Sequence, residues 1–345
     1  MLFQYRARPR FKSWLPILVA ALVLGSGAPA LSSQKQQALD DWLHNMIQNA
    51  VMGHDFAWLE TTSEQYRAKK VRMPSGRWAL NKFYVTLEEH CGMDSGEQVS
   101  PLMTEFYAKW QAEYPQSPAP SIILASCHLA AAMNLRGQGF AQDVWDDAWA
   151  PMFKKLEEAI AILEKNKARA GHDPHWHSIK ARALLYLNVP EEVFSANIEE
   201  AIRVEPLYQS NYITAFYHYL PRWGGSYERA QRWARRATAR TSESLGDAMY
   251  AWMALSLRGM HSDEEIMRDY KFDWAKLKKG MIDLFEIQQT PDFNNAMDFV
   301  AMSCAMRDVK HAEKVWNVWK AATPDWPEFK AEVQCAPKKV ASRKI

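Results

Sequence analysis

Residues 173–206 read DPHWHSIKARALLYLNVPEEVFSANIEEAIRVEP and contain two amphipathic segments joined by a short turn. After Pro174, apolar residues recur at the three- and four-residue spacing of a helix. They are Trp176, Ile179, Ala183 and Leu184. A second helical pattern covers 193–204, and Pro206 follows Pro174 by 32 residues. This is close to the period of tetratricopeptide-like helix pairs, which bury their apolar faces only by stacking on neighbouring pairs.

The pattern continues on both sides of this stretch. On the C-terminal side, the expected helix pairs are 208–220 with 227–238, 245–258 with 274–288, and 293–306 with 312–322. On the N-terminal side, the expected helices are 36–51, 55–66, 78–89, 102–114, 121–135 and 151–163. Pro151 fits the first turn of the last of these, where a missing N–H costs nothing. The sequence therefore predicts an all-α fold, an α-solenoid of stacked antiparallel helix pairs.

Composition agrees with helices that pack through large rings. The 345 residues include 15 Trp but only 14 Gly, and runs of β-branched residues are few. We expect four regions along the chain. They are a signal peptide at 1–30, an N-terminal helical region at 31–170, tetratricopeptide-like repeats at 171–337, and a basic tail at 338–345.

The first 30 residues have the layout of a secretory signal peptide. Four basic residues precede the apolar run Leu15–Leu24, and Ala28-Pro29-Ala30 supplies small residues for cleavage after Ala30. This predicts export, most simply to a bacterial periplasm. The alternative is an uncleaved inner-membrane anchor formed by residues 15–31, although the apolar run is short for a span. Membrane contact is expected only through such an uncleaved N-terminus.

Removal of residues 1–30 changes the sign of the net charge. The whole chain has a formal charge of +2, and loss of Arg6, Arg8, Arg10 and Lys12 leaves 38 Lys and Arg against 40 Asp and Glu. A mature chain with about −2 gives no electrostatic reason to expect nucleic-acid binding.

The chain has four cysteines, an even number, and all follow the signal peptide. In an oxidising compartment they can form two disulfides, with three connectivities. Proximity in sequence favours Cys91 with Cys127 and Cys304 with Cys335. Buried free thiols are the alternative.

Several segments resemble a family of exported bacterial proteins known as a domain of unknown function with tetratricopeptide-like helices. The matching residues spread over about 36–240. They are Asp55-Phe56 with Leu59 and Tyr66, Ser75–Trp78 followed by Phe83-Tyr84, Leu135–Ala141, and the turn Tyr219-Leu220-Pro221-Arg222-Trp223-Gly224-Gly225-Ser226. The resemblance implies a helical fold and a bacterial envelope setting. It implies no reaction.

The turn after the helix at 208–220 is the densest motif. Pro221 ends that helix, Gly224 and Gly225 allow a tight turn, and Ser226 is placed to cap the next helix. Arg222 and Trp223 are not needed for the turn, so they form either a structural cation–π pair or part of a binding surface. Aromatic residues cluster around them, and Tyr and Arg are favoured at interfaces. The candidate partner-binding residues are Arg222, Trp223, Tyr217 and Tyr208.

Other motifs have simpler structural interpretations. His172, Asp173, His175 and His177 form a compact group, but residues two apart on a helix point in different directions, and Asp173 fits an N-cap. The arginines at 229, 232, 235, 236 and 240 form a charged stripe, either a solvated face or a contact for an acidic partner. No motif predicts a catalytic residue, a metal site or a cofactor.

These observations favour a non-enzymatic scaffold of the bacterial envelope that binds a protein or an extended peptide of unknown identity. The alternative is an envelope enzyme whose site is assembled from dispersed residues. His128, His172 and His218 would be its first candidates.

Overall fold

The computed structural model describes residues 33–73, 76–92, 98–137, 141–288, 293–322 and 327–335. The expected signal peptide, the alternative anchor at 15–31 and the basic tail at 338–345 lie outside these ranges or at their margin. All described residues belong to one compact unit, Leu31–Ile345. They are helical throughout, and the only strand-like pairings among them are the isolated bridges Arg72 with Trp78 and Arg258 with His261.

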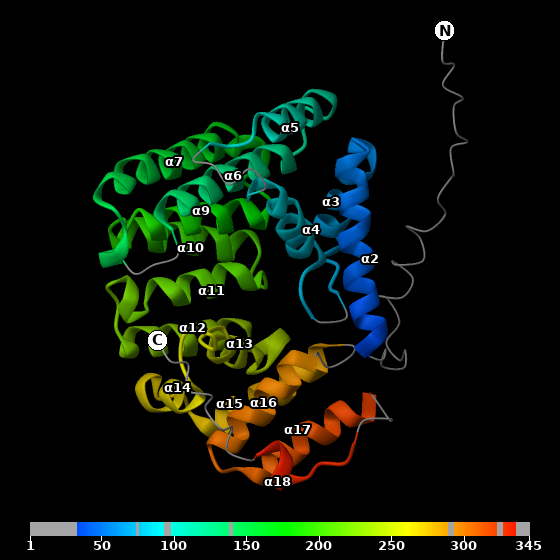
Figure 1. Ribbon diagram of the computed structural model, residues 1–345, viewed down its shortest axis with the longest axis vertical. Helices are drawn as coiled ribbons and strands as arrows, with labels where there is room; N and C mark the ends of the chain where they lie inside the picture. Colours follow the sequence, from blue (N-terminus) through cyan, green and yellow to red (C-terminus); the bar gives the residue numbers. More distant parts are fainter. Residues whose placement is uncertain are drawn as a thin grey trace, which may run out of the picture. The chain divides into compact units, whose positions relative to one another are not determined.

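The N-terminal helices agree closely with the apolar patterns (Figure 1). Their bounds are α2 Ser33–Met52, α3 Phe56–Lys69, α4 Ala79–Glu88, α5 Pro101–Glu113, α6 Ala119–Arg136, α7 Asp146–Lys165 and α8 Lys167–Ala170. Asp55 caps α3 by accepting from the backbone N–H of Trp58 at 3.0 Å. The most extensive packing of this part joins α6 to α7.

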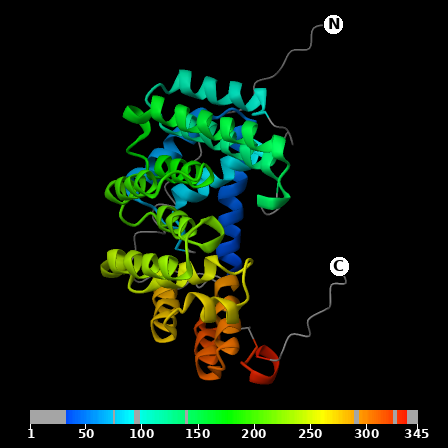
Figure 2. The same cartoon turned by 90° about the vertical axis from the view of Figure 1, so that its left-hand side faces the viewer.

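The following helices pack only partly as the sequence pairs them. They are α9 Pro174–Tyr186, α10 Glu191–Val204, α11 Gln209–His218, α12 Tyr227–Leu245, α13 Ala248–Ser256, α14 Asp263–Tyr270, α15 Trp274–Ile287, α16 Phe293–Ala305, α17 Val309–Ala322 and α18 Ala331–Gln334. Helix α9 packs on α10, α13 on α15, and α16 on α17, as expected. Helices α11 and α12 also touch, but α11 packs more extensively on α9 and α12 on α13. Figure 2 shows α16 and α17 side by side.

Helix α9 belongs to both hydrophobic cores of the chain. Trp176 and Ile179 are buried in the cluster formed by α2 to α9, whereas Leu184 and Leu185 are buried in the cluster that extends to α17. Trp176 also donates its indole N–H to the Leu163 carbonyl at 3.0 Å, so its polar edge is satisfied inside the core. The helix that opens the repeat pattern therefore joins the two cores.

Contacts far apart in sequence attach α3 and α4 to the later helices. Trp78 donates its indole N–H to the Leu207 carbonyl at 2.9 Å, and its ring meets Tyr208 edge to face. Lys70 pairs with Glu205 at 2.7 Å. These contacts place the α3–α4 connection against the turn between α10 and α11.

Two disulfides join helical segments. Cys91, just after α4, bonds to Cys127 in α6, and Cys304 in α16 bonds to Cys335 after α18. These are the same pairs that sequence proximity favours. No described cysteine is free.

Several helix boundaries differ from the sequence prediction, and α12 extends to Leu245, past its expected end at 238. Helix α7 begins at Asp146, so Pro151 lies inside it and not in its first turn. Asp146 and Asp147 start the helix because acidic side chains favour its positive N-terminal end, and exposed Pro151 leaves its lost hydrogen bond on the solvent side. Helix α14 was not predicted, since its eight residues are mostly polar; a capping box between Ser262 and Glu265 starts it.

Candidate functional site

The turn between α11 and α12 sets the position of the α12 side chains. Leu220 is extended before Pro221, and Gly224 adopts a left-handed φ of +80°. A Cβ on Gly225 would lie 2.0 Å from the Tyr219 carbonyl oxygen, so only glycine fits there. The Ser226 hydroxyl accepts from the Arg229 N–H at 3.2 Å and caps α12. The predicted roles of these residues are confirmed.

Helix α12 carries an unusual concentration of positive charge. Its 19 residues include five arginines and two glutamates, a formal charge of +3. All five arginines are exposed or half-exposed, whereas Ala230, Trp233, Ala234 and Ala237 bury the opposite side of the helix. We call the exposed side the arginine face; it consists of Arg229, Arg232, Arg235, Arg236 and Arg240.

Aromatic rings and carboxylates hold part of the arginine face in place. The Arg229 guanidinium lies over the Tyr219 ring at 5.2 Å, and Arg236 lies over Trp233 at 5.8 Å. Arg229 also pairs with Glu191, near the start of α10. Glu199, two turns further along α10, accepts from Arg236 at 2.6 Å and from Arg240 at 2.8 Å. The α10 carboxylates thus bind three of the five arginines of α12.

A pocket of about 260 Å³, here called the arginine pocket, opens between α10 and α12. Its lining residues are Glu191, Tyr219, Arg229, Arg232, Trp233 and Arg236. Three guanidinium groups face one carboxylate, so the lining has a formal charge of +2. The aromatic rings keep two of the guanidinium groups at the wall, which suits the pocket to an anionic ligand.

A second pocket of about 210 Å³, the tyrosine pocket, lies between α12 and α14. Its lining residues are Tyr227, Glu228, Gln231, Arg232, Arg235, Asp269, Tyr270 and Lys271. Tyr227 and Tyr270 pack edge to face, with ring centroids 4.8 Å apart. Burial raises the pKa of Tyr270 to about 12, so its hydroxyl is neutral at physiological pH. The pocket therefore offers apolar ring surface with charged groups around it.

Arg232 lines both pockets. It is exposed, and among the described residues it forms no ion pair within 4.0 Å, unlike Arg229, Arg236 and Arg240. Its guanidinium group is therefore the one on the arginine pocket wall with no described carboxylate within 4.0 Å, and Glu228, four residues earlier on α12, acts on it only at longer range.

The structure brings together three of the four predicted binding residues. Arg222 is exposed and lies over the Trp223 ring at 5.7 Å, and Trp223 contacts Tyr186 of α9 with ring centroids 5.5 Å apart. Tyr217 is half-buried and donates to the Ser256 carbonyl at 3.1 Å. Arg222 also reaches the Met260 sulfur. The structure therefore combines the two alternatives expected for these residues. Arg222 and Trp223 form a cation–π pair, and Arg222 is also exposed at the surface.

Tyr208 does not belong to that surface. Its side chain is fully buried, so it offers a partner nothing to contact. Its hydroxyl meets Nδ1 of His175 at 2.8 Å and accepts from Asn81 at 3.5 Å. The aromatic density around 208–227 placed Tyr208 in the candidate site, but as the N-cap of α11 it turns toward α4 and α9. We therefore exclude it from the binding surface.

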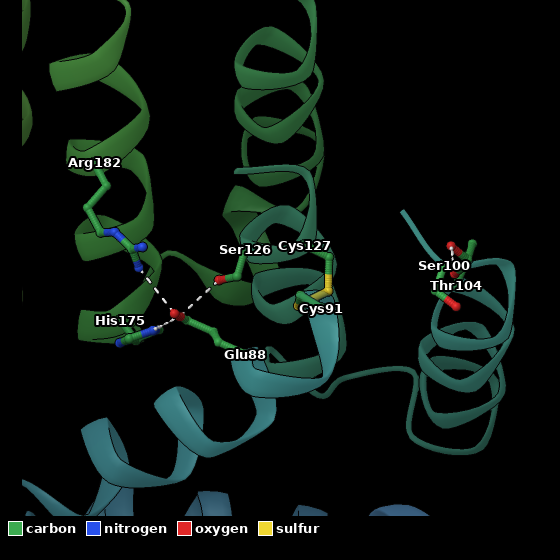
Figure 3. The surroundings of a disulfide bond; sticks show 8 residues. All are labelled: Glu88, Cys91, Ser100, Thr104, Ser126, Cys127, His175 and Arg182. Carbon is green, nitrogen blue, oxygen red and sulfur yellow. Dashed lines mark hydrogen bonds and ion pairs between the residues drawn. A yellow bond between two sulfur atoms is a disulfide. The ribbon is translucent and has the colours of Figure 1, made fainter. Parts of the chain in front are cut away.

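His175 and Glu88 are the centre of a buried polar network (Figure 3). Glu88 accepts from His175 Nε2 at 2.9 Å, from Ser126 at 3.1 Å and from Arg182 at 3.2 Å. Burial opposes ionisation of Glu88, but Arg182 and His175 outweigh it and lower the pKa of this carboxyl to about 2. Figure 3 shows the cluster beside the Cys91–Cys127 disulfide.

Both ring nitrogens of His175 are occupied within the protein. Because the Glu88 carboxylate only accepts, Nε2 donates to it, and Nδ1 then accepts from Tyr208 in the neutral tautomer. Asp173 accepts from Arg67, Tyr84 and the His175 backbone, which confirms its N-cap role. The network therefore connects α3, α4, α6, α9 and α11 and leaves His175 no lone pair for a substrate.

The other histidines singled out by sequence lie apart from one another. His128 is half-buried, and its Nδ1 lies 3.0 Å from Glu158 of α7, which Lys155 also contacts at 2.9 Å. Burial lowers the pKa of His128. His218 stacks on Phe194 with centroids 3.9 Å apart, and His172 is exposed. No group of three His, Cys, Asp or Glu among the described residues is arranged to hold a metal ion.

Sequence reasoning found the five arginines but not their partners. Glu191, Glu199, Tyr219 and Trp233 become neighbours only when α10 and α12 pack together. A signal was present: Glu191 and Glu199 are eight residues apart on one helix, and Arg229 and Arg236 are seven apart on the other. Such matched spacings put opposite charges on facing helix surfaces.

Comparisons with known proteins find no match: no family model, no curated protein and no solved structure matches the chain. The resemblance drawn from the turn at 219–226 thus remains a prediction. A search of the described helices for one long and apolar enough to cross a membrane finds none.

Proposed function

We propose that this chain is an exported helical-repeat protein of the bacterial envelope, an α-solenoid of stacked antiparallel helix pairs that binds a segment of another protein. The observation that carries the proposal is the arginine face. It combines a +3 helix, two pockets and two ring-supported guanidinium groups in a chain whose predicted mature charge is about −2.

A solvated helix face does not need pockets on both sides of an exposed arginine. Clusters of Arg with Tyr and Trp are typical of the residues that dominate binding energy at protein interfaces. Arg222 and Trp223, at the turn that leads into α12, extend this chemistry with a second exposed arginine on an indole ring. Together they provide several anchors for one partner.

Two features support the export part of the proposal. All four cysteines are paired in disulfides, which are typical of oxidising compartments such as the periplasm. The first 30 residues have the composition of a signal peptide. Retention of the N-terminus would instead leave an inner-membrane anchor at residues 15–31, with the same helical unit outside the membrane.

A crosslinking pull-down of the full-length chain, carrying a C-terminal tag in its own host, tests the proposal. We expect one discrete partner with the native chain and its loss with Arg232→Glu. The partner should persist with Arg77→Glu, which reverses an exposed arginine on the α3–α4 connection. Equal recovery by all three chains, or no partner from any, would refute binding at the arginine face.

The second candidate function is an enzyme with a dispersed site, and His128 is the observation in its favour. Glu158 orients this imidazole, and burial favours its neutral form, as a general base requires. A screen of envelope substrates with native protein and with His128→Gln would support this candidate if turnover depended on His128.

A further inference from the structure

The arginine face has a charge pattern that identifies its ligand more closely, if the proposed binding function holds. We propose that it binds an extended acidic peptide segment whose carboxylates occupy the arginine pocket and whose next apolar side chain occupies the tyrosine pocket. The ligand is thus a stretch of a partner protein with acidic residues at alternate positions, followed by a large apolar residue.

The arginine pocket already contains one carboxylate of the kind proposed. Glu191 lines the pocket and binds Arg229, while the Arg229 guanidinium rests on Tyr219. Glu199 is bound in the same way by Arg236 and Arg240. The chain thus shows how carboxylates are bound on this surface, with planar guanidinium groups presenting paired donors. Arg232 has the same chemistry and no such carboxylate among the described residues.

The spacing of the arginines suits an extended chain. Arg229 and Arg236 are seven residues apart on α12, which is about 10 Å along the helix axis. Alternate side chains of an extended peptide point the same way and are about 7 Å apart. Arg232 lies between them, about 5–6 Å along the axis from each, so two carboxylates at positions i and i+2 can reach Arg232 and one of its two neighbours. Consecutive acidic residues would point to opposite faces, and half of them would miss the pocket.

The position of the tyrosine pocket indicates in which direction the bound peptide runs across α12. Because Arg232 lines both pockets, a chain that contacts Arg232 in the first can continue across α12 into the second. There it meets the half-exposed ring of Tyr227, which packs edge to face on the buried Tyr270. An apolar side chain gains by leaving water on the Tyr227 ring.

This combination distinguishes a peptide from other anions. A phosphate or a lipid headgroup would use the guanidinium groups but has no side chain for the tyrosine pocket. The basic tail at 338–345 is excluded as an occupant by its charge. An acidic peptide supplies both chemistries on one chain with the required spacing.

Fluorescence anisotropy with labelled synthetic peptides tests the inference on the full-length purified protein. The probe is a ten-residue peptide with glutamate at three alternate positions and leucine two residues after the last. Its isomer has the same composition with the three glutamates consecutive. We expect the alternate peptide to bind about tenfold more tightly and Arg232→Ala to remove that advantage, because charge-assisted contacts are lost. Arg77→Ala is the matched control and should bind like the native protein.

The leucine tests the second pocket separately. Replacing it with glycine should weaken binding to the native protein several-fold. It should have no such effect on Tyr227→Ala, in which the ring wall is gone. Folding of each variant is verified by its helical circular dichroism and urea midpoint. If the leucine matters equally in both proteins, the tyrosine pocket is not its site and the inference is wrong.

Other outcomes assign the site differently. Equal affinity for the two isomers, or no effect of Arg232→Ala, would overturn the inference. So would Arg232-dependent binding of inorganic phosphate or phosphatidylglycerol vesicles in preference to the peptide. The proposed function is tested separately, by the crosslinking pull-down from cells, and it is wrong if no partner is recovered. If cells yield a partner whose bound segment is not acidic, the function stands and this inference falls.

Discussion

Arg67 of α3 donates from Nε to Asp173 at 2.7 Å, a contact between residues 106 positions apart that joins the N-terminal helices to the first residue before α9. Asp173 is fully buried and Arg67 is 13% exposed. Asp173 also caps α9 and accepts from Tyr84 at 2.6 Å. The pair therefore fixes α3 and α4 against the helix that belongs to both hydrophobic cores.

Replacing one member of this pair should destabilise the protein strongly. Arg67→Met leaves the Asp173 carboxylate buried without its cation, which costs about 3–5 kcal/mol of unfolding free energy. Urea denaturation measures the change. Lys109→Met, which breaks the exposed Lys109–Glu105 pair, should leave stability almost unchanged. The double variant Arg67→Met with Asp173→Asn should be more stable than Arg67→Met alone; a double variant that is less stable would contradict the ion-pair account.

Two neighbouring glycines should respond differently to alanine. A Cβ at Gly225 would collide with the Tyr219 carbonyl, so Gly225→Ala must move the backbone and should cost about 3 kcal/mol or more. At Gly224 a Cβ meets nothing within 4 Å, and only the left-handed φ opposes it, at about 1–2 kcal/mol. Urea midpoints compare the two variants. Equal losses would show that backbone conformation, and not the close approach, requires glycine here.

Glu88 should make stability fall at strongly acidic pH. Arg182 and His175 hold the folded-state pKa of this carboxyl near 2, below its usual value of 4.5, so the unfolded chain binds a proton first. The contribution is present above pH 4.5 and is lost as pH falls toward 2, by about 2 kcal/mol between pH 6 and pH 3. Glu88→Gln should lose less stability over this interval, as measured by urea denaturation. The exposed Glu105→Gln control should follow the native curve, and a native-like slope in Glu88→Gln would contradict the prediction.

His311 should make the stability of the protein depend on pH over a higher range than Glu88 does. Burial lowers the pKa of this imidazole from 6.5 to about 4, and its Nδ1 is hydrogen bonded to Ser303 at 2.9 Å. The folded state therefore binds its proton later than the unfolded state. Stability is complete above pH 6.5 and falls by about 2 kcal/mol between pH 8 and pH 5. His311→Asn should lack this part of the decline, whereas His172→Asn, at an exposed histidine, should keep it. Identical slopes in both variants would rule out His311 as the source.

The positions of the helices could be predicted from the sequence more fully than the contacts between them. Apolar periodicity located α9, α10, α16 and α17 closely, because their buried apolar residues recur at helical spacing. It missed α14, whose eight residues are mostly polar and depend on a capping box and on packing against α12 and α16. The predicted position of Pro151 in the first turn was wrong. Acidic residues start α7 earlier, at Asp146, and an exposed proline is tolerated inside the helix.

The candidate site was predicted only in part. Composition identified the five arginines and the turn with Arg222 and Trp223, since these follow one another in the chain. The carboxylates that bind Arg229 and Arg236 lie 38 and 37 residues away, so the matched spacings of the two charge sets are the one sign of the pairing in the sequence. Tyr208 shows the opposite error: a residue near the aromatic cluster in sequence belongs to a buried network that joins it to His175.

Photo-crosslinking from position 235, next to Arg232 on the arginine face, in living cells tests the central claim most directly. A photoreactive residue replaces Arg235, which lines the tyrosine pocket and leaves Arg232 intact, and the captured segment is sequenced by mass spectrometry. The account predicts one partner, captured through a segment with alternate acidic residues, and loss of capture when Arg232→Glu is added. The same photoreactive residue at position 77 should capture nothing specific. Capture that is unchanged by Arg232→Glu, or equal at the two positions, would contradict the claim that the arginine face is a binding site.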